Sequence, residues 1–500
     1  MNKFIVLSTI AALSTISVAS EVNYQEQIDE LTAQIKQLQK NEKRTKKKLS
    51  KVNAQSAKDN IKFDVDFRTS YDNLQYNMTG TGMDGEMNPN PKKYKNDALY
   101  AMRLWLGMGY APDGTNMIFK GQLSMNKAFG ASYGQRATGH GFDEFDWIRN
   151  EQLTDDSVHV REAYWLWTPS IGGVGTTFSV GRRPATNGYL INLREDDKAK
   201  SPLGHVINME FDGASASVSL DQLVTGSFFK LCAGRGLTNA ASWASQATYY
   251  VGSPVGSNQP NYSTVDSSLD NTDMLGFIIK AYDDGQYALE GTYYRGFNVP
   301  GMLENPQFDP QKPIDQTNPA MLMNTVGNMD GAALSFKVEG IGDEINDFLD
   351  ETIFFASYAW TKSDPKDGGS MLGSMDSETG SSYWVGLLTP NLTGGKFGLE
   401  YNHGSEHWKP FTYGEDTMVG SKMAVRGSAY EAYWTQPIIG RMFSMQVRYT
   451  YLDYDYTGSD GFFGSGGAPI DVTDTATLTA YNMNAIDTAQ DIRVYFRYRY

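Results

Sequence analysis

The chain ends in Ile492-Arg493-Val494-Tyr495-Phe496-Arg497-Tyr498-Arg499-Tyr500, where apolar side chains alternate with three arginines and one tyrosine. Successive side chains of a β-strand point to opposite faces, so this stretch predicts a strand with one apolar and one basic face. At the edge of a water-exposed sheet such a strand would aggregate. In a closed membrane barrel the apolar face contacts lipid and the arginines face an aqueous lumen. The stretch therefore predicts the wall of a transmembrane β-barrel.

The same period of two recurs along the chain, for example at 61–68, 102–108, 119–125 and 443–449. These stretches extend to about ten residues, which is the length that a tilted strand needs to cross a bilayer. The mean hydropathy of -0.45 with 13% aromatic residues fits such strands, because lipid-facing and water-facing residues alternate and their hydropathies average out. A soluble sandwich or propeller fits less well, since no internal repeat is visible. An all-β membrane barrel is the predicted fold class.

The connections between these stretches alternate between short and long. Tight turns are predicted near 111–114, 169–173, 222–226, 283–285, 340–350, 390–395 and 436–440. Long polar loops are predicted at about 73–96, 128–156, 184–205, 236–271, 298–329, 363–380, 405–420 and 457–486. Eight loops and seven turns imply about sixteen antiparallel strands, with eighteen as the alternative. An even number places both chain ends on the periplasmic side.

The N-terminal residues have the pattern of a secretory signal peptide. Lys3 precedes an apolar run from Phe4 to Ile16, and small residues follow at 17–20. The run is too short and too rich in Ser and Thr for a membrane anchor, which needs ~20 apolar residues. The expected organisation is a signal peptide at 1–20, a periplasmic coiled coil at 21–58 and an outer-membrane barrel at 59–500.

Residues 28–52 repeat apolar side chains at spacings of three and four, as in an α-helical coiled coil. The seam consists of Ile28, Leu31, Ile35, Leu38, Leu49 and Val52, weakened by Glu42 and Thr45. Ile and Leu at these positions favour a dimer in isolation, whereas attachment to a trimeric barrel would impose three strands. The basic cluster 43–48 leaves two interpretations open: a short oligomerisation stalk, or a tether that contacts peptidoglycan.

Composition excludes several classes of function. The net charge of -15 argues against nucleic acid as a partner, while acidic loops fit either cation bridging to lipopolysaccharide or simple solubility. Cys232 is the only cysteine, so no intramolecular disulfide, CxxCH haem site or cysteine-based zinc site is expected. His403 and His407 are four residues apart but fall at a predicted strand end and loop, so no metal site is predicted. No GxSxG or phosphate-binding motif is present, and neither an enzyme nor a cofactor is expected.

Two passages carry a family resemblance. Arg161–Trp165, followed after a turn by Phe178–Pro184, resembles the strand-turn-strand passage before the third loop of general Gram-negative porins. With the coiled coil and Leu231–Gly236, most of the chain is similar to a family of ε-proteobacterial proteins described only as a domain of unknown function. The C-terminal strand resembles the signal recognised by the barrel assembly machinery, through Val494, Phe496, Tyr498 and Tyr500. The resemblance implies an outer-membrane location among lipid and lipopolysaccharide, and a homotrimer.

The porin resemblance also implies a constriction, because the third loop of general porins folds inward and sets acids against a basic ladder. Here the third loop, 184–205, contains Arg194, Glu195, Asp196 and Asp197. The wall arginines expected to face the lumen by alternation are Arg103, Arg182, Arg183, Arg448, Arg493 and Arg497. The alternative is that such arginines only form wall salt bridges, with Asp64, Asp66, Glu290, Glu339 and Glu400.

These expectations lead to a porin-like channel for passive diffusion of small hydrophilic solutes or ions, with anion preference as a secondary expectation. A structural envelope protein or adhesin is the alternative, with a plugged barrel and a coiled coil that tethers the outer membrane to the cell wall. A barrel that forms a sheath around a partner chain is a third reading.

Overall fold

The computed structural model describes residues 61–500 except 85, 113, 132–152, 154–155, 184–186, 241–268, 306, 310, 312–320, 343–344, 372, 413–415 and 459–466. The chain divides into a unit of residues 1–60 and a unit of residues 61–500. The predicted signal peptide and the coiled-coil seam from Ile28 to Val52 lie outside the described residues. Everything below concerns the second unit.

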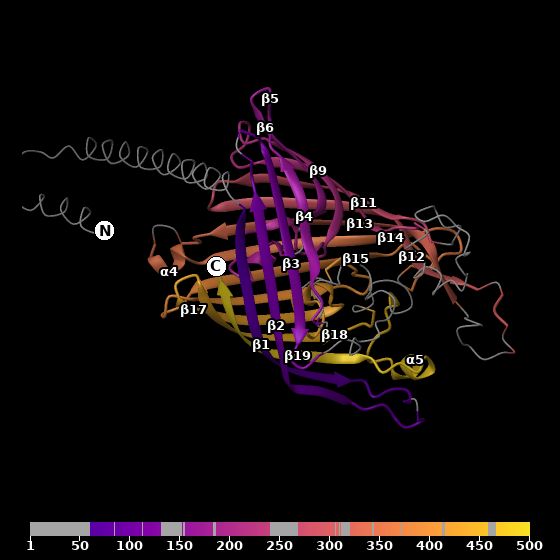
Figure 1. Ribbon diagram of the computed structural model, residues 1–500. Coiled ribbons are helices and arrows are strands. Elements are labelled where there is room, and N and C mark those ends of the chain that lie inside the picture. The colour runs from indigo at the N-terminus through magenta and orange to yellow at the C-terminus, as the bar shows by residue number, and fades with distance from the viewer. Residues whose placement is uncertain are drawn as a thin grey trace, which may run out of the picture. The chain divides into compact units, whose positions relative to one another are not determined.

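Sixteen antiparallel strands form a closed barrel (Figure 1). In chain order the wall strands are β1 (Lys62–Met78), β2 (Lys93–Tyr110), β3 (Met117–Ala128), β4 (His159–Trp167), β6 (Val174–Arg183), β9 (Phe211–Ser219), β10 (Phe228–Leu237), β11 (Thr272–Asp283), β12 (Tyr287–Glu304), β13 (Met321–Glu339), β14 (Ile353–Pro365), β15 (Thr379–Pro390), β16 (Lys396–Gly404), β17 (Gly427–Ile439), β18 (Phe443–Tyr454) and β19 (Ile486–Arg499). The predicted fold class and strand number are confirmed, and the alternative of eighteen strands is wrong.

The first and last strands close the ring. β1 (indigo in Figure 1) pairs with β19 (yellow), so that Phe67 lies opposite Tyr498 and Thr69 opposite Phe496. The C-terminal stretch that predicts the fold is therefore the strand that completes it. Backbone hydrogen bonds then continue around the whole ring, which leaves no open sheet edge.

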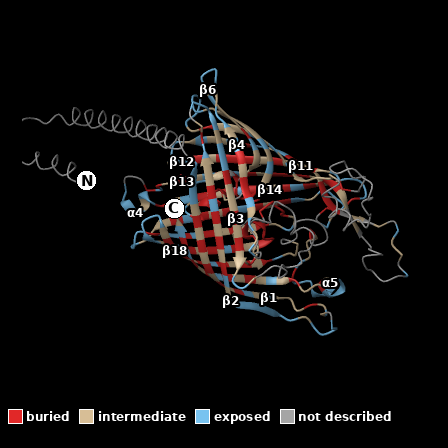
Figure 2. Ribbon diagram, viewed as in Figure 1, coloured by how far each residue is buried: buried red, intermediate tan, exposed pale blue. Residues whose placement is uncertain are grey.

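The two faces of the wall differ as the alternation predicts. On β19 the side chains of Arg493 and Arg497 are buried inside the barrel, whereas Ile492 and Phe496 are 46% and 42% exposed on the outside. Figure 2 shows this alternation as a chequered pattern along the strands. Large apolar residues are exposed on the outer face of many strands, as at Trp165, Leu231, Phe336 and Trp434. An outer surface of this kind belongs in contact with lipid.

All seven predicted turns connect neighbouring strands at one end of the barrel, and the eight predicted loops connect them at the other. β5 (Ser170–Ile171) pairs with the start of β6, and α4 (Asp347–Asp350) forms part of the turn between β13 and β14. Among the residues that the structure describes, no helix is long and apolar enough to span a membrane.

In the part of the chain that the structure describes, two loop segments pack inside the barrel and contribute to its core. The L3 segment (187–210) contains β7 (Gly188–Tyr189), α2 (Ile191–Arg194) and β8 (Lys200–Leu203), and the L7 segment (405–426) contains η2 (Lys422–Ala424). Ile207 pairs with Phe411, and the Asn208 N–H donates to the Phe411 carbonyl at 2.7 Å. Both segments pack against buried aromatic residues of the wall, namely Tyr294, Phe355, Trp384 and Tyr433. The hydrophobic core thus lies inside the lumen.

Candidate pore constriction

The tip of the L3 segment reaches the wall formed by β16 to β19. Arg194, the last residue of α2, lies 3.1 Å from Glu431 on β17. Glu195 accepts a hydrogen bond of 3.1 Å from the Tyr495 hydroxyl. Asp196 has a left-handed backbone (φ 51°), which reverses the chain so that its side chain meets Lys396 at 2.9 Å. The structure thus brings the predicted third-loop residues to one side of the lumen.

Asp197 completes this contact, because its carboxylate lies 3.0 Å from both Arg497 and Arg499. Arg497 also donates through Nε to Asp66 on β1 at 3.0 Å and through Nη1 to the Glu195 carbonyl at 2.9 Å. One guanidinium group therefore joins the L3 segment, β19 and β1. This multiple use exploits the fixed fork of donors that distinguishes Arg from Lys.

The predicted wall arginines Arg103, Arg448, Arg493 and Arg497 all face the lumen and are buried. Arg448 lies 3.4 Å from Glu195. These positions follow from the period of two on β2, β18 and β19, so sequence alternation located them correctly.

Arg182 and Arg183 cannot both face the lumen, because they are consecutive on β6. Arg183 faces inward, with its guanidinium 5.0 Å from the Tyr164 ring centroid. Arg182 lies on the same outer face as the exposed Val180 and pairs with Asp212 at 3.3 Å. The prediction that Arg182 faces the lumen is therefore wrong.

Asp416 of the L7 segment is the functional candidate that the sequence did not reveal. Its carboxylate lies 2.7 Å from Arg68, 3.0 Å from Arg493 and 3.4 Å from Arg103, and its carbonyl accepts from Arg448 at 2.7 Å. Arg68 was visible in the alternation of β1, but a loop aspartate has no periodicity that would indicate its direction. The arginine ladder therefore meets acids from two loops.

The electrostatics of the two loop acids follow from this crowding. Burial by itself would raise the pKa of Asp416, but the guanidinium groups of Arg68 and Arg493 outweigh it and hold that pKa well below its usual value. Burial and the neighbouring Asp416 both act to raise the pKa of Glu195. Arg194 and Arg448 outweigh these two effects, so the Glu195 pKa is lowered. Both loop carboxylates are ionised at neutral pH.

A buried lysine of the L7 segment also holds this segment to the wall. Lys422 in η2 lies 2.6 Å from Glu400 on β16 and also pairs with Glu431 on β17. Thr450 donates to Glu431 at 2.9 Å. Glu431 thus receives groups from the L3 segment, the L7 segment and β18. A carboxylate with this many donors holds both loops in one position.

Trp105 of β2, two strands from β19 in the ring, contacts two arginines. The guanidinium carbons of Arg103 and Arg161 lie 3.5 Å and 4.0 Å from the Trp105 ring system. Arg161 also lies 3.5 Å from Glu210 at the end of the L3 segment. Guanidinium planes over an indole gain cation–π stabilisation. The L3 segment is therefore held to β4 near its end and to β17 and β19 at its tip.

The alternative of simple wall salt bridges describes part of what is seen. Asp66 pairs with Arg497, whereas Glu290, Glu339 and Glu400 pair with lysines. Every arginine of the constriction has a carboxylate partner, so its charge is compensated within the lumen. Among the described residues no group of three or more His, Cys, Asp or Glu is placed to hold a metal ion.

The family model described as Protein of unknown function (DUF3373) matches residues 93–500. The chain belongs to this family. The match covers every wall strand except β1, together with both inward segments. No curated protein matches the DUF3373 chain.

Solved structures similar to this DUF3373 protein include outer-membrane barrels. A Salmonella typhi OmpF complex with daunomycin has a TM-score of 0.42 at 11% identity, over 87% of this chain and 97% of that one. An anion-selective porin from Comamonas acidovorans has a TM-score of 0.43 at 10% identity, over 88% and 99%. OmpT of Vibrio cholerae has a TM-score of 0.42 at 10% identity, over 88% and 97%. At such values the likeness carries no function across.

Proposed function

We propose that this DUF3373 protein is an outer-membrane channel of low conductance for ions and small hydrophilic solutes. One observation carries the proposal: the L3 segment crosses the lumen and its tip pairs with the arginines of the opposite wall. Charged groups that are held in place at a narrow point select solutes by size and charge. The apolar outer face of the strands supports the membrane location.

The lumen arginines led us to expect anion preference, but their carboxylate partners weaken that expectation. Glu195, Asp197 and Asp416 bring negative charge to the same place, so the field of the ladder is largely cancelled at short range. We therefore expect weak selectivity between cations and anions. Unpaired lumen arginines would have been needed for a strong anion filter.

Planar-bilayer recording of the refolded chain in a salt gradient tests this proposal. Stepwise ohmic openings of small amplitude, with a reversal potential near zero, are the expected result. A strongly anion-selective current would restore the original expectation about the arginines. A silent bilayer with a verified folded barrel would contradict the channel.

A sealed barrel with a structural role in the envelope is the second candidate. The hydrophobic core inside the lumen supports it, because Trp384, Phe355 and Tyr433 pack against both inward segments and exclude water there. A silent bilayer would move this candidate to first place.

We also propose a homotrimer that is assembled by the barrel assembly machinery, with lipopolysaccharide around it and with the N-terminal segment touching peptidoglycan. The C-terminal aromatic strand, including Phe496 and Tyr500, supports recognition by the assembly machinery. Cross-linking of the membrane-embedded protein tests the trimer, and sedimentation with isolated peptidoglycan tests the cell-wall contact.

A further inference from the structure

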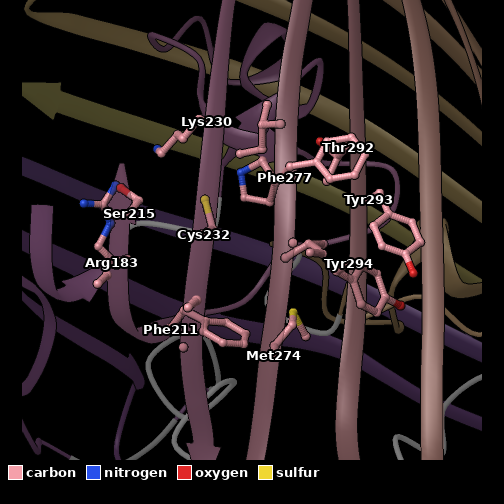
Figure 3. Close-up of a pocket in the computed structure, with 17 residues that line it drawn as sticks. Arg183, Phe211, Ser215, Lys230, Cys232, Met274, Phe277, Thr292, Tyr293 and Tyr294 are labelled. Atoms are coloured by element: carbon pink, nitrogen blue, oxygen red, sulfur yellow. The ribbon is translucent and has the colours of Figure 1, made fainter. Parts of the chain in front are cut away.

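A cavity of about 80 Å³ lies between the L3 segment and the wall strands β6 and β9 to β12 (Figure 3). Small wall residues leave room for it, since Gly234 of β10 and Gly276 of β11 line the cavity. Pro202 and Ile207 of the L3 segment cover the space that results.

Two cationic side chains line one side of this cavity. Figure 3 shows Arg183 and Lys230 on the same side as Ser215 and Cys232. Within the described part of the chain, the buried Nη1 of Arg183 has no hydrogen-bond partner and the Arg183 guanidinium no carboxylate partner. The arginines of the constriction, by contrast, are all paired. Arg183 is partly buried, and an anionic ligand would accept a hydrogen bond from its unpartnered Nη1 group.

The remaining lining decides which kind of anion fits. Phe211, Ile207, Met274, Ile278 and Tyr294 give most of the cavity an apolar surface. A phosphate or sulfate would leave several oxygens without donors against this surface, which is unfavourable. An anion with a single charged end and an apolar body suits both sides of the cavity.

We propose that this cavity binds a small organic monocarboxylate. Its carboxylate lies between Arg183 and Lys230, and its apolar part packs on Phe211 and Met274. One water requires roughly 10–15 Å³ of such space, so the cavity holds a ligand of about six non-hydrogen atoms. Butyrate has this size. The site is separate from the constriction and does not depend on the proposed channel activity.

Cys232 provides a built-in reporter, because it lines the cavity and is the only cysteine of the chain. The full-length chain, refolded in detergent, is treated with the small neutral reagent methyl methanethiosulfonate, and modification is followed by intact mass. Saturating butyrate should slow the modification by about tenfold, because an occupied cavity excludes the reagent. Butyramide, the neutral analogue of the same size, should have little effect.

Two variants locate the effect. Arg183→Gln should abolish the protection by butyrate while the cysteine stays reactive. Arg235→Gln is the matched control: Arg235 lies on β10 as Lys230 does, but on the outer face, where it pairs with Asp273 at 2.6 Å. This variant should be protected as the wild type is.

Equal protection by butyrate and butyramide, or full protection in Arg183→Gln, would overturn the proposal. If the reagent does not reach Cys232 in the folded barrel, calorimetric titration with butyrate decides instead. Saturable heat that is lost in Arg183→Gln and kept in Arg235→Gln then supports the site. Absence of heat in the wild type overturns it, whether or not the barrel conducts.

Discussion

Asp416 is the residue on which the lumen arginines converge, and its substitution is the sharpest single-residue test. Asp416→Asn leaves Arg68, Arg103 and Arg493 facing one another without the loop carboxylate. We expect the reversal potential to shift toward anion selectivity, because positive charge is uncovered. We also expect the free energy of unfolding to fall by about 3 kcal/mol, since one partner of a buried ion pair is removed.

Asp376→Asn is the matched control for this substitution, because Asp376 is an exposed aspartate of another loop. It should change neither quantity. An unchanged reversal potential in a folded, conducting Asp416→Asn barrel would mean that ions do not pass the arginine cluster.

The acidity of Glu195 and Asp416 gives a pH prediction. Both pKa values are lower in the folded protein than in the unfolded chain. The stabilisation that the ionised carboxylates give to the docked loops is therefore complete above about pH 4.5 and is lost as the pH falls through the folded values. We expect a constant single-channel conductance between neutral pH and about pH 5, and a rise below about pH 4 as the loops are released.

The double variant Glu195→Gln, Asp416→Asn should lack this acid transition, since neither position can then titrate. A transition of the wild type between about pH 6 and 7 would contradict the assignment to these two carboxylates.

The sequence predicted which residues face the lumen correctly wherever the alternation of strand side chains was applied correctly. Arg103, Arg448, Arg493 and Arg497 face the lumen as their strands predict. Arg182 failed because two consecutive strand residues were assigned to one face, which the geometry of a strand forbids. Residues in loops, such as Asp416, have no such rule.

At the scale of elements, the L3 segment is the part whose removal should change conduction most. Replacement of 188–203 by a short Gly-Ser linker removes β7, α2 and β8 but leaves the wall strands intact. We expect the conductance to rise by roughly threefold, because the segment no longer crosses the lumen. Single-channel recording measures this directly.

Replacement of the β1–β2 loop (79–92) by a linker of the same kind is the control and should leave the conductance unchanged. An L3 replacement that folds but conducts as the wild type does would contradict the constriction. Heat-modifiable migration in gels verifies that both variants are folded barrels.

The inward L3 segment was expected only through resemblance to porins, and the inward L7 segment was not expected at all. A polar loop with a few apolar residues, such as Trp408, Phe411 and Met423, indicates burial of some kind. It does not say which surface covers those residues, because the partners Trp384, Tyr294 and Ile207 are distant in sequence. Tertiary contacts of this kind have no local signal.

At the scale of the whole molecule, turns and loops predicted the barrel well. Each of the seven turns and eight loops includes the connection that the structure shows, because a change of strand direction needs Gly, Pro, Asn or Asp locally. The predicted loops 73–96 and 298–329 are too long, since β1 runs to Met78, β2 begins at Lys93, β12 runs to Glu304 and β13 begins at Met321. The number of strands then follows from the number of turns and loops between them. What lies inside the ring does not follow, since composition does not distinguish an empty lumen from a filled one.

Deletion of 21–58 with the signal peptide retained tests the role of the N-terminal segment. Residues 61–500 form a compact unit of their own, so we expect the barrel to fold and insert normally. Cross-linking should then show whether oligomers are lost, which would favour a stalk. Detachment of the outer membrane with unchanged solute uptake would favour a tether, and a barrel that fails to fold would contradict the division into two units.

The ring has one joint where the chain is not continuous through a turn or loop, and that joint is between β1 and β19. Asp416 touches Arg68 on one side of it and Arg493 on the other, and Arg497 of β19 grips Asp66 of β1. Asp416 of the L7 segment therefore links β1 to β19 across this joint, in addition to the backbone pairing of the two strands. We expect any lateral opening of the wall toward the bilayer between β1 and β19 to require that Asp416 first release one of these two strands.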